Sequence, residues 1–101
     1  MGADRPLSTV EVTGPMTLAE APRWREALLA ALARGHDLRI DLAGAGPWDT
    51  AGLQLILAAL ASGRRSGQGV WLARVPRVFL AVAEQAALAE HLAVAIEDTA
   101  D

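Results

Sequence analysis

Residues 40–57, IDLAGAGPWDTAGLQLIL, contain the junction that decides the fold, where an apolar run meets a short loop and a helix begins. Asp49 and Thr50 stand at the start of that helix, and either side chain can accept hydrogen bonds from its first free backbone N–H groups. These N–H groups and the helix dipole also make the position receptive to an anion, so a phosphate on Thr50 would fit there. Taken alone, the pair is most simply interpreted as an N-cap.

The helix that follows this junction is amphipathic. Residues 62–69 are rich in turn formers and end it, while residues 38–42, before the junction, alternate as a half-buried strand. Residues 43–47 predict a turn rather than a phosphate-binding Walker loop, because the chain contains no lysine. Four aliphatic residues recur at the spacing of one buried helical stripe: Leu53, Ile56, Leu57 and Leu60.

The same periodicities predict further elements on both sides of this segment. Residues 9–13 alternate as a half-buried strand, and a helix begins near Pro22. Residues 70–73 are apolar on both faces, which favours an inner strand of a sheet covered by helices. Another helix opens at Pro76, and residues 92–96 alternate as a last strand, although their alanine-rich surroundings also permit a helix.

Alternation of strands and helices is typical of an α/β domain with right-handed crossovers. We therefore predict a sheet of about four mostly parallel strands packed with three helices. The 101 residues suffice for one domain, residues 1–101, with its core between about residues 9 and 96.

The composition argues against several classes of function. The net charge is −3 and the nine basic residues are spread along the chain, so nucleic acid is not an expected partner. No run reaches the roughly 18 apolar residues of a membrane span, so we expect no membrane insertion. Without cysteine, the chain lacks disulfides and thiol chemistry, which is compatible with the cytoplasmic location that we expect.

Residues able to carry catalysis or bind a metal are few and scattered. His36 and His91 are the only histidines, and neither has a second histidine at metal-ligand spacing. Arg64 and Arg65 are interpreted as a solvated helix end that interacts favourably with the helix dipole. We predict no catalytic residues, no metal and no cofactor, and hence a protein that is not an enzyme.

The three tryptophans fall in different surroundings. Trp24 and Trp71 lie on apparent core faces, whereas Trp48 stands in the loop just before Asp49. Trp48 could anchor a partner protein, since large aromatic side chains dominate many interfaces, or it could cover the core. The sequence leaves both alternatives open.

A family resemblance appears in the residues around the junction. Residues 40–42, IDL, followed by residues 49–53, DTAGL, and an aliphatic helix resemble the signature of STAS domains, the family named for sulfate transporters and anti-sigma factor antagonists. The likeness extends to the turn at Gly14, the strand at residues 69–72 and the helix at residues 75–88, and covers about residues 9–96.

The resemblance implies a bacterial, non-enzymatic signal-transduction module that binds a serine/threonine kinase or anti-sigma factor. In this family the hydroxyl at the start of the second helix is phosphorylated by the partner kinase, so Thr50 is the implied phosphorylation site. The implied partner-binding residues are Trp48, Asp49, Thr50, Ala51 and Gly52. A phosphate at Thr50 would add about −1.5 to −2 charges, enough to switch an interface without refolding the domain.

Two further assignments within the family remain open. The short outline and the Asp49-Thr50 pair also resemble the cytoplasmic STAS subunit of the bacterial phospholipid-transport ABC complex, which binds the ATPase subunit. Thr17, where many antagonists have an acidic residue, favours this alternative. Residues 50–54, TAGLQ, are in addition similar to STAS adaptors of chemotaxis or two-component signalling.

Overall fold

Three parallel strands form the central sheet, in the spatial order β1-β2-β3. The computed structural model describes residues 5–100, so the ends of the predicted domain, residues 1–4 and 101, lie outside the described residues. The elements in chain order are β1 (Leu7–Met16), α1 (Ala21–Ala33), β2 (Asp37–Trp48), α2 (Thr50–Arg65), β3 (Val70–Ala73), α3 (Arg77–Gln85) and α4 (Ala89–Ala93).

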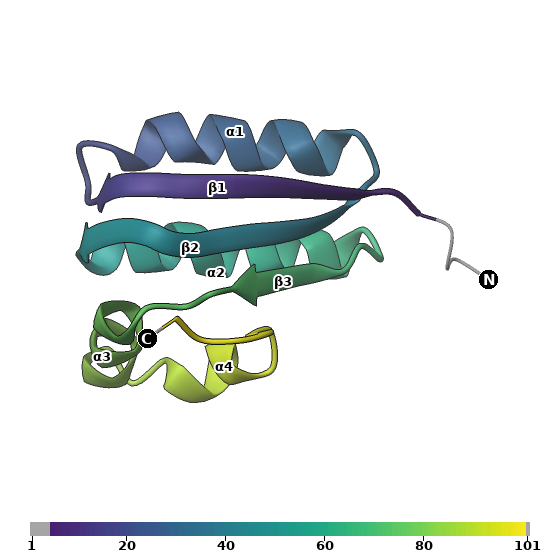
Figure 1. Cartoon of the computed structure of the whole chain (residues 1–101). Coiled ribbons are helices and arrows are strands. Elements are labelled where there is room, and N and C mark those ends of the chain that lie inside the picture. Colours follow the sequence, from purple (N-terminus) through teal and green to yellow (C-terminus); the bar gives the residue numbers. More distant parts are fainter. Residues whose placement is uncertain (1–4, 101) are drawn as a thin grey trace.

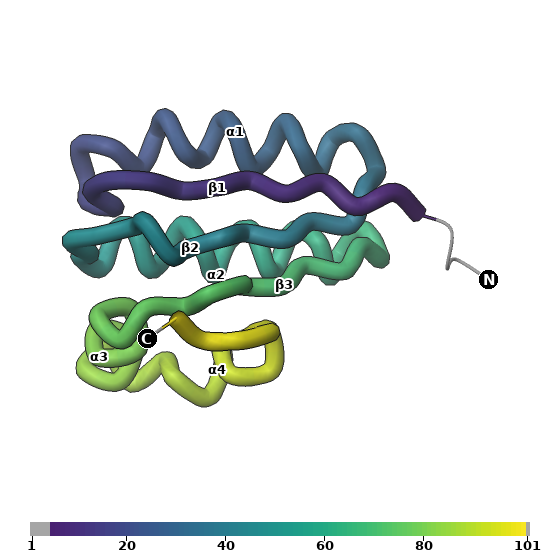
Figure 2. The backbone as a smooth tube through the Cα atoms, in the orientation of Figure 1, coloured from purple at the N-terminus to yellow at the C-terminus, as the bar shows by residue number. Residues whose placement is uncertain are grey.

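Helices α1 and α2 run side by side on one face of the sheet, and α3 and α4 lie beside its β3 edge (Figure 1). The tube in Figure 2 shows the chain returning through each helix before the next strand, as parallel pairing requires. Residues alternate across the sheet, so Val12 is buried toward the helices while Thr9 and Glu11 are exposed on the opposite face. The core contains the aliphatic residues predicted from the strands and from the α2 stripe, among them Leu38, Ile40, Leu42, Leu53, Ile56 and Leu60.

Strand β2 is longer than predicted, and the turn expected at residues 43–47 is wrong. These residues continue the strand and pair with the end of β1, where Thr13 faces Gly44 and Met16 faces Trp48. The register shifts twice along this stretch, as it does at β-bulges. The glycine and proline residues of this stretch favoured a turn in the sequence. The pairing that makes it a strand comes from β1, 31 or 32 residues earlier in the chain.

The predicted last strand at residues 92–96 is also wrong. Residues 89–93 form α4, with Leu92 buried, and Val94 is 83% exposed, so the alternation does not describe a strand face. After the helix, Ile96 and Thr99 make only isolated parallel bridges to the segment that begins with β3. High helix propensity of the alanine-rich stretch explains the outcome, and the described residues form three strands rather than four.

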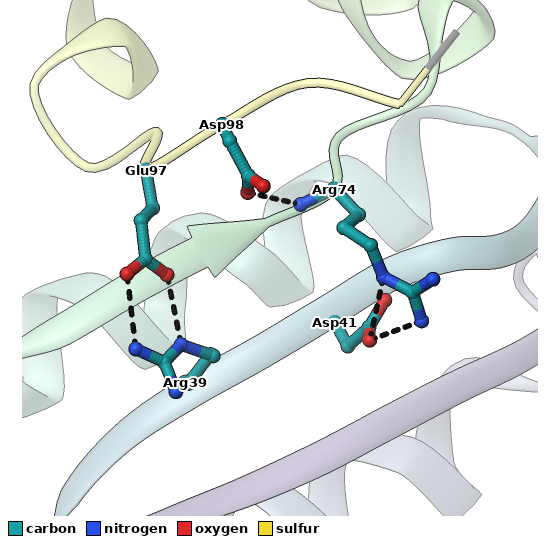
Figure 3. Close-up of polar contacts among 5 residues, drawn as sticks. All are labelled: Arg39, Asp41, Arg74, Glu97 and Asp98. Carbon is teal, nitrogen blue, oxygen red and sulfur yellow. Dashed lines mark hydrogen bonds and ion pairs between the residues drawn. The ribbon is translucent and has the colours of Figure 1, made fainter.

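An ion pair and a hydrogen bond hold the C-terminal segment, and a second ion pair joins Arg74 to β2 on the same face of the sheet (Figure 3). Arg39 donates two hydrogen bonds to the carboxylate of Glu97, at 2.8 and 2.9 Å. The guanidinium of Arg74 donates to Asp41 Oδ2 at 2.6 and 3.1 Å, and the backbone N–H of Arg74 donates to Asp98 Oδ1 at 2.7 Å. The residues after α4 are thus held by side chains as well as by the two backbone bridges.

These pairs make the stability of the fold depend on pH. The hydrogen bond from Arg74 holds the pKa of the Asp41 carboxyl below its ordinary value, against the opposite effect of burial. Arg39 lowers the pKa of Glu97 in the same way. Carboxyl groups with a lowered folded-state pKa stabilise the fold above their unfolded pKa of about 4, and this contribution is lost as the pH falls through the folded-state values.

We therefore predict that Asp41→Asn lowers the urea midpoint of unfolding at about pH 7 and that the difference from wild type shrinks toward about pH 3. Circular dichroism during urea titration measures both values. Asp98→Asn serves as the control, because its amide oxygen can still accept the N–H of Arg74. An Asp41→Asn deficit that is equal at both pH values contradicts the prediction.

The first turn of α2 packs directly on the end of β1. Gly52 is buried, and a Cβ atom at this position would overlap the backbone carbonyl oxygen of Met16. Asp49 N–H also donates to that oxygen, at 3.2 Å. Glycine is therefore required here by close approach within the chain, since any side chain would push the helix away from the strand.

We predict that Gly52→Ala lowers the free energy of unfolding by about 2 kcal/mol, although alanine favours helices in general. Chemical denaturation measures the loss. Gly63→Ala in the same helix is the matched control: its Cβ would meet a methyl group of Val70, which can move more easily than a backbone carbonyl, so we expect a smaller loss. A Gly52→Ala variant as stable as the wild type would show that β1 and α2 can separate at little cost.

Candidate partner-binding site at the start of α2

Asp49 is the N-cap of α2, and Thr50 is the first helical residue. The Asp49 backbone is extended, and its Oδ1 accepts hydrogen bonds from the N–H groups of Ala51 at 2.9 Å and Gly52 at 3.2 Å. Its Oδ2 accepts a third bond at 3.0 Å, from the N–H of Leu18 in the β1–α1 loop. The predicted cap is therefore confirmed and belongs to Asp49, which also ties a second loop to the start of the helix.

The charge of Asp49 changes what this helix start can bind. Burial raises the pKa of the carboxyl, but the N–H groups of Leu18, Gly52 and Ala51 together hold it below its ordinary value. The carboxylate is thus ionised near neutral pH and occupies the N–H groups that were expected to be free for an anion. A phosphate on Thr50 would stand beside this carboxylate rather than replace it.

Thr50 is the residue of the predicted set that faces outward. Its side chain is exposed, and among residues 5–100 it has no side-chain hydrogen bond. Gln54, four residues later and therefore on the same face of the helix, is exposed as well. Ala51 and Asp49 are half-buried, so the accessible chemistry of this turn is the hydroxyl of Thr50.

Two other residues of the predicted set face inward. Trp48 is 8% exposed and packs edge-on against Phe79, with ring centroids 4.7 Å apart and planes at 67°. Of the two alternatives for Trp48, the structure supports the one in which it covers the core. Gly52 is buried and packs closely on Met16, and its role as a partner contact stays a prediction. The predicted core position of Trp71 is wrong, because this side chain is 38% exposed.

An apolar groove runs from this turn between α1 and α2. Leu18 stands at its end, 73% exposed although its N–H is bonded to Asp49. Arg25 and Glu26 place opposite charges along the groove. The sequence did not reveal this feature, because an isolated leucine in a loop has no periodicity to mark it. The other residues that line the groove are Ala21, Pro22, Gln54, Leu55 and Ala58.

Neither a cluster of metal ligands nor a membrane-spanning helix is found in the part of the chain that the structure describes. Residues 5–100 contain no cluster of three or more metal-ligating side chains, and His36 instead shares a hydrogen bond of 2.7 Å with Ser8. None of the helices described is both long and apolar enough to span a bilayer.

Comparisons with known proteins bear on the fold and the family of this chain. A search of curated proteins gave no match. Among solved structures, a sulfate transporter family protein from Wolinella succinogenes shares the fold, with a TM-score of 0.73 and 15% sequence identity over 89% of this chain and 75% of that one. A family model described as "Mlab, STAS domain" matches residues 2–95. The protein therefore belongs to the STAS domain family, as the residues around Asp49 and Thr50 predicted.

Proposed function

We propose that this protein is a non-enzymatic regulatory module that binds a partner protein through the first turn of α2 and the adjoining α1–α2 groove. One observation carries the proposal: the Asp49 carboxylate bonds both the start of α2 and the loop that holds Leu18. A solvent-exposed hydroxyl and a solvent-exposed leucine are thereby held on one rigid surface. Exposed apolar side chains beside a groove are a common feature of protein interfaces.

The partner that fits the family resemblance is a serine/threonine kinase or anti-sigma factor, with Thr50 as the phosphorylated residue. The Thr50 hydroxyl is accessible to a kinase, and its phosphate would lie next to the ionised Asp49. Because Asp49 already caps the helix, the added charge would point toward the partner and repel it, while the fold stays intact. We therefore expect binding in the unphosphorylated state and release after phosphorylation.

The cytoplasmic STAS subunit of a phospholipid-transport ABC complex is the second candidate. The matching family model carries the name Mlab, and Thr17 lacks the acidic group of many anti-sigma antagonists. In this function the same surface would bind the ATPase subunit permanently. Thr50 would then be a contact residue, and no phosphate would be needed.

We predict that Thr50→Asp weakens binding to the kinase-type partner by about tenfold or more, because it places a second negative charge beside Asp49. Leu18→Ser should weaken binding through the groove without adding charge. Ser66→Asp, which adds the same charge at the exposed far end of α2, is the matched control and should bind as wild type does. Calorimetric titration of each purified variant with the partner measures the affinities, and unchanged binding by both Thr50→Asp and Leu18→Ser would reject this surface.

Incubation with ATP and the partner separates the two functions. For the switch we expect mass spectrometry to find phosphate on Thr50, with the partner released as the modified fraction grows. For the transport subunit we expect a stable complex with an ABC ATPase, without phosphate, that Thr50→Glu disrupts. Phosphate at another residue, with binding unchanged, would rule out the switch.

A further inference from the structure

A second hollow lies at the opposite end of α2, between that helix and α4. Leu60, Val70 and Val94 form its apolar walls, and Arg64 and His91 line it as well. Arg64 is 14 residues from Thr50, which at 1.5 Å per helical residue puts the two sites about 20 Å apart. The hollow is therefore separate from the surface proposed above for partner binding.

Two of the side chains that line this hollow bind no other side chain among the described residues. Among residues 5–100, neither Arg64 nor His91 makes a side-chain hydrogen bond or an ion pair, whereas Arg39 and Arg74 each bind a carboxylate. Both residues also line an adjoining hollow along α2, so they stand together where the two spaces meet. The C-terminal end of a helix carries about −0.5 elementary charge and therefore repels anions. The full positive charge of Arg64 is larger than this negative charge.

The apolar walls show that the hollow would accept more than a bare ion. Val94 is 83% exposed at its rim, an unusual position for a large aliphatic side chain that contributes almost nothing to the core. The volume of about 200 Å³ lies below the roughly 300–1,000 Å³ of pockets for drug-sized ligands. A ligand of a few carbon atoms is therefore the size that fits.

We propose that this hollow binds a small carboxylate with a short aliphatic chain. Arg64 pairs with the carboxylate through its planar guanidinium, and His91 provides a further N–H donor at the same end of the ligand. The aliphatic chain lies against Leu60, Val70 and Val94.

Hexanoate is the probe that tests the proposal, with 1-hexanol and acetate as the matched ligands that lack the charge and the chain. In ¹H–¹⁵N NMR titrations we expect saturable shifts around Arg64, His91 and Val94, with a dissociation constant on the order of 1 mM for hexanoate. We expect binding about tenfold weaker for either control ligand. Thr50→Asp should not alter these values, so the result is independent of the partner-binding site.

Three substitutions test which side chains of the hollow bind the ligand. Arg64→Gln should weaken hexanoate binding to the level of 1-hexanol, whereas Arg65→Gln, whose side chain faces the α1 side of the helix, should leave it unchanged. Val94→Asp should weaken it as well, and because Val94 is 83% exposed the substitution removes little buried surface. Absence of saturable shifts, equal binding of 1-hexanol, or equal losses in Arg64→Gln and Arg65→Gln would overturn the proposal.

Discussion

The carboxylate of Asp49 is the interaction on which the arrangement of this domain depends. It accepts two N–H groups of the α2 first turn and one from the β1–α1 loop, and so connects segments 31 residues apart in the sequence. Hydrogen bonds to an ionised acceptor are about twice as strong as those between neutral groups. The loop with Leu18 and the turn with Thr50 therefore hold a fixed position relative to each other.

Close packing reinforces this connection from inside. Gly52 lets α2 approach the end of β1, where the carbonyl oxygen of Met16 also accepts the N–H of Asp49. Trp48 packs on Phe79 immediately below, so the same short segment joins the sheet, α2 and α3. The residues of the predicted binding motif therefore differ in role. Trp48 and Gly52 stabilise the fold, whereas the side chain of Thr50 is exposed to solvent.

Local patterns predicted the elements whose burial follows a simple period. Residues 70–73 form a strand as predicted, but β3 lies at the edge of the described three-stranded sheet, so the inner position predicted for it is wrong. The predicted stripe on α2 is correct for Leu53, Ile56 and Leu60, which are buried because one side of the helix packs on the core. Residues 43–48 failed because their extended structure depends on pairing with β1, which no window of neighbouring residues contains. Residues 92–96 failed for another reason: the alternation of aliphatic residues was real, but local helix propensity prevailed and left Val94 in solvent.

The polar face of the sheet and the start of α2 separate what stabilises this small domain from the surface proposed to bind a partner. Parallel sheets are usually covered on both faces, yet here one face carries ion pairs of Arg39 and Arg74 instead of helices. The Arg39–Glu97 pair holds the C-terminal segment on this face without a contribution from α2. A modification of Thr50 would change the charge at the start of α2 and leave the Asp49 hydrogen bonds in place. A negative group added beside an existing carboxylate acts on whatever approaches from solvent, so regulation of binding does not require a second conformation of the domain.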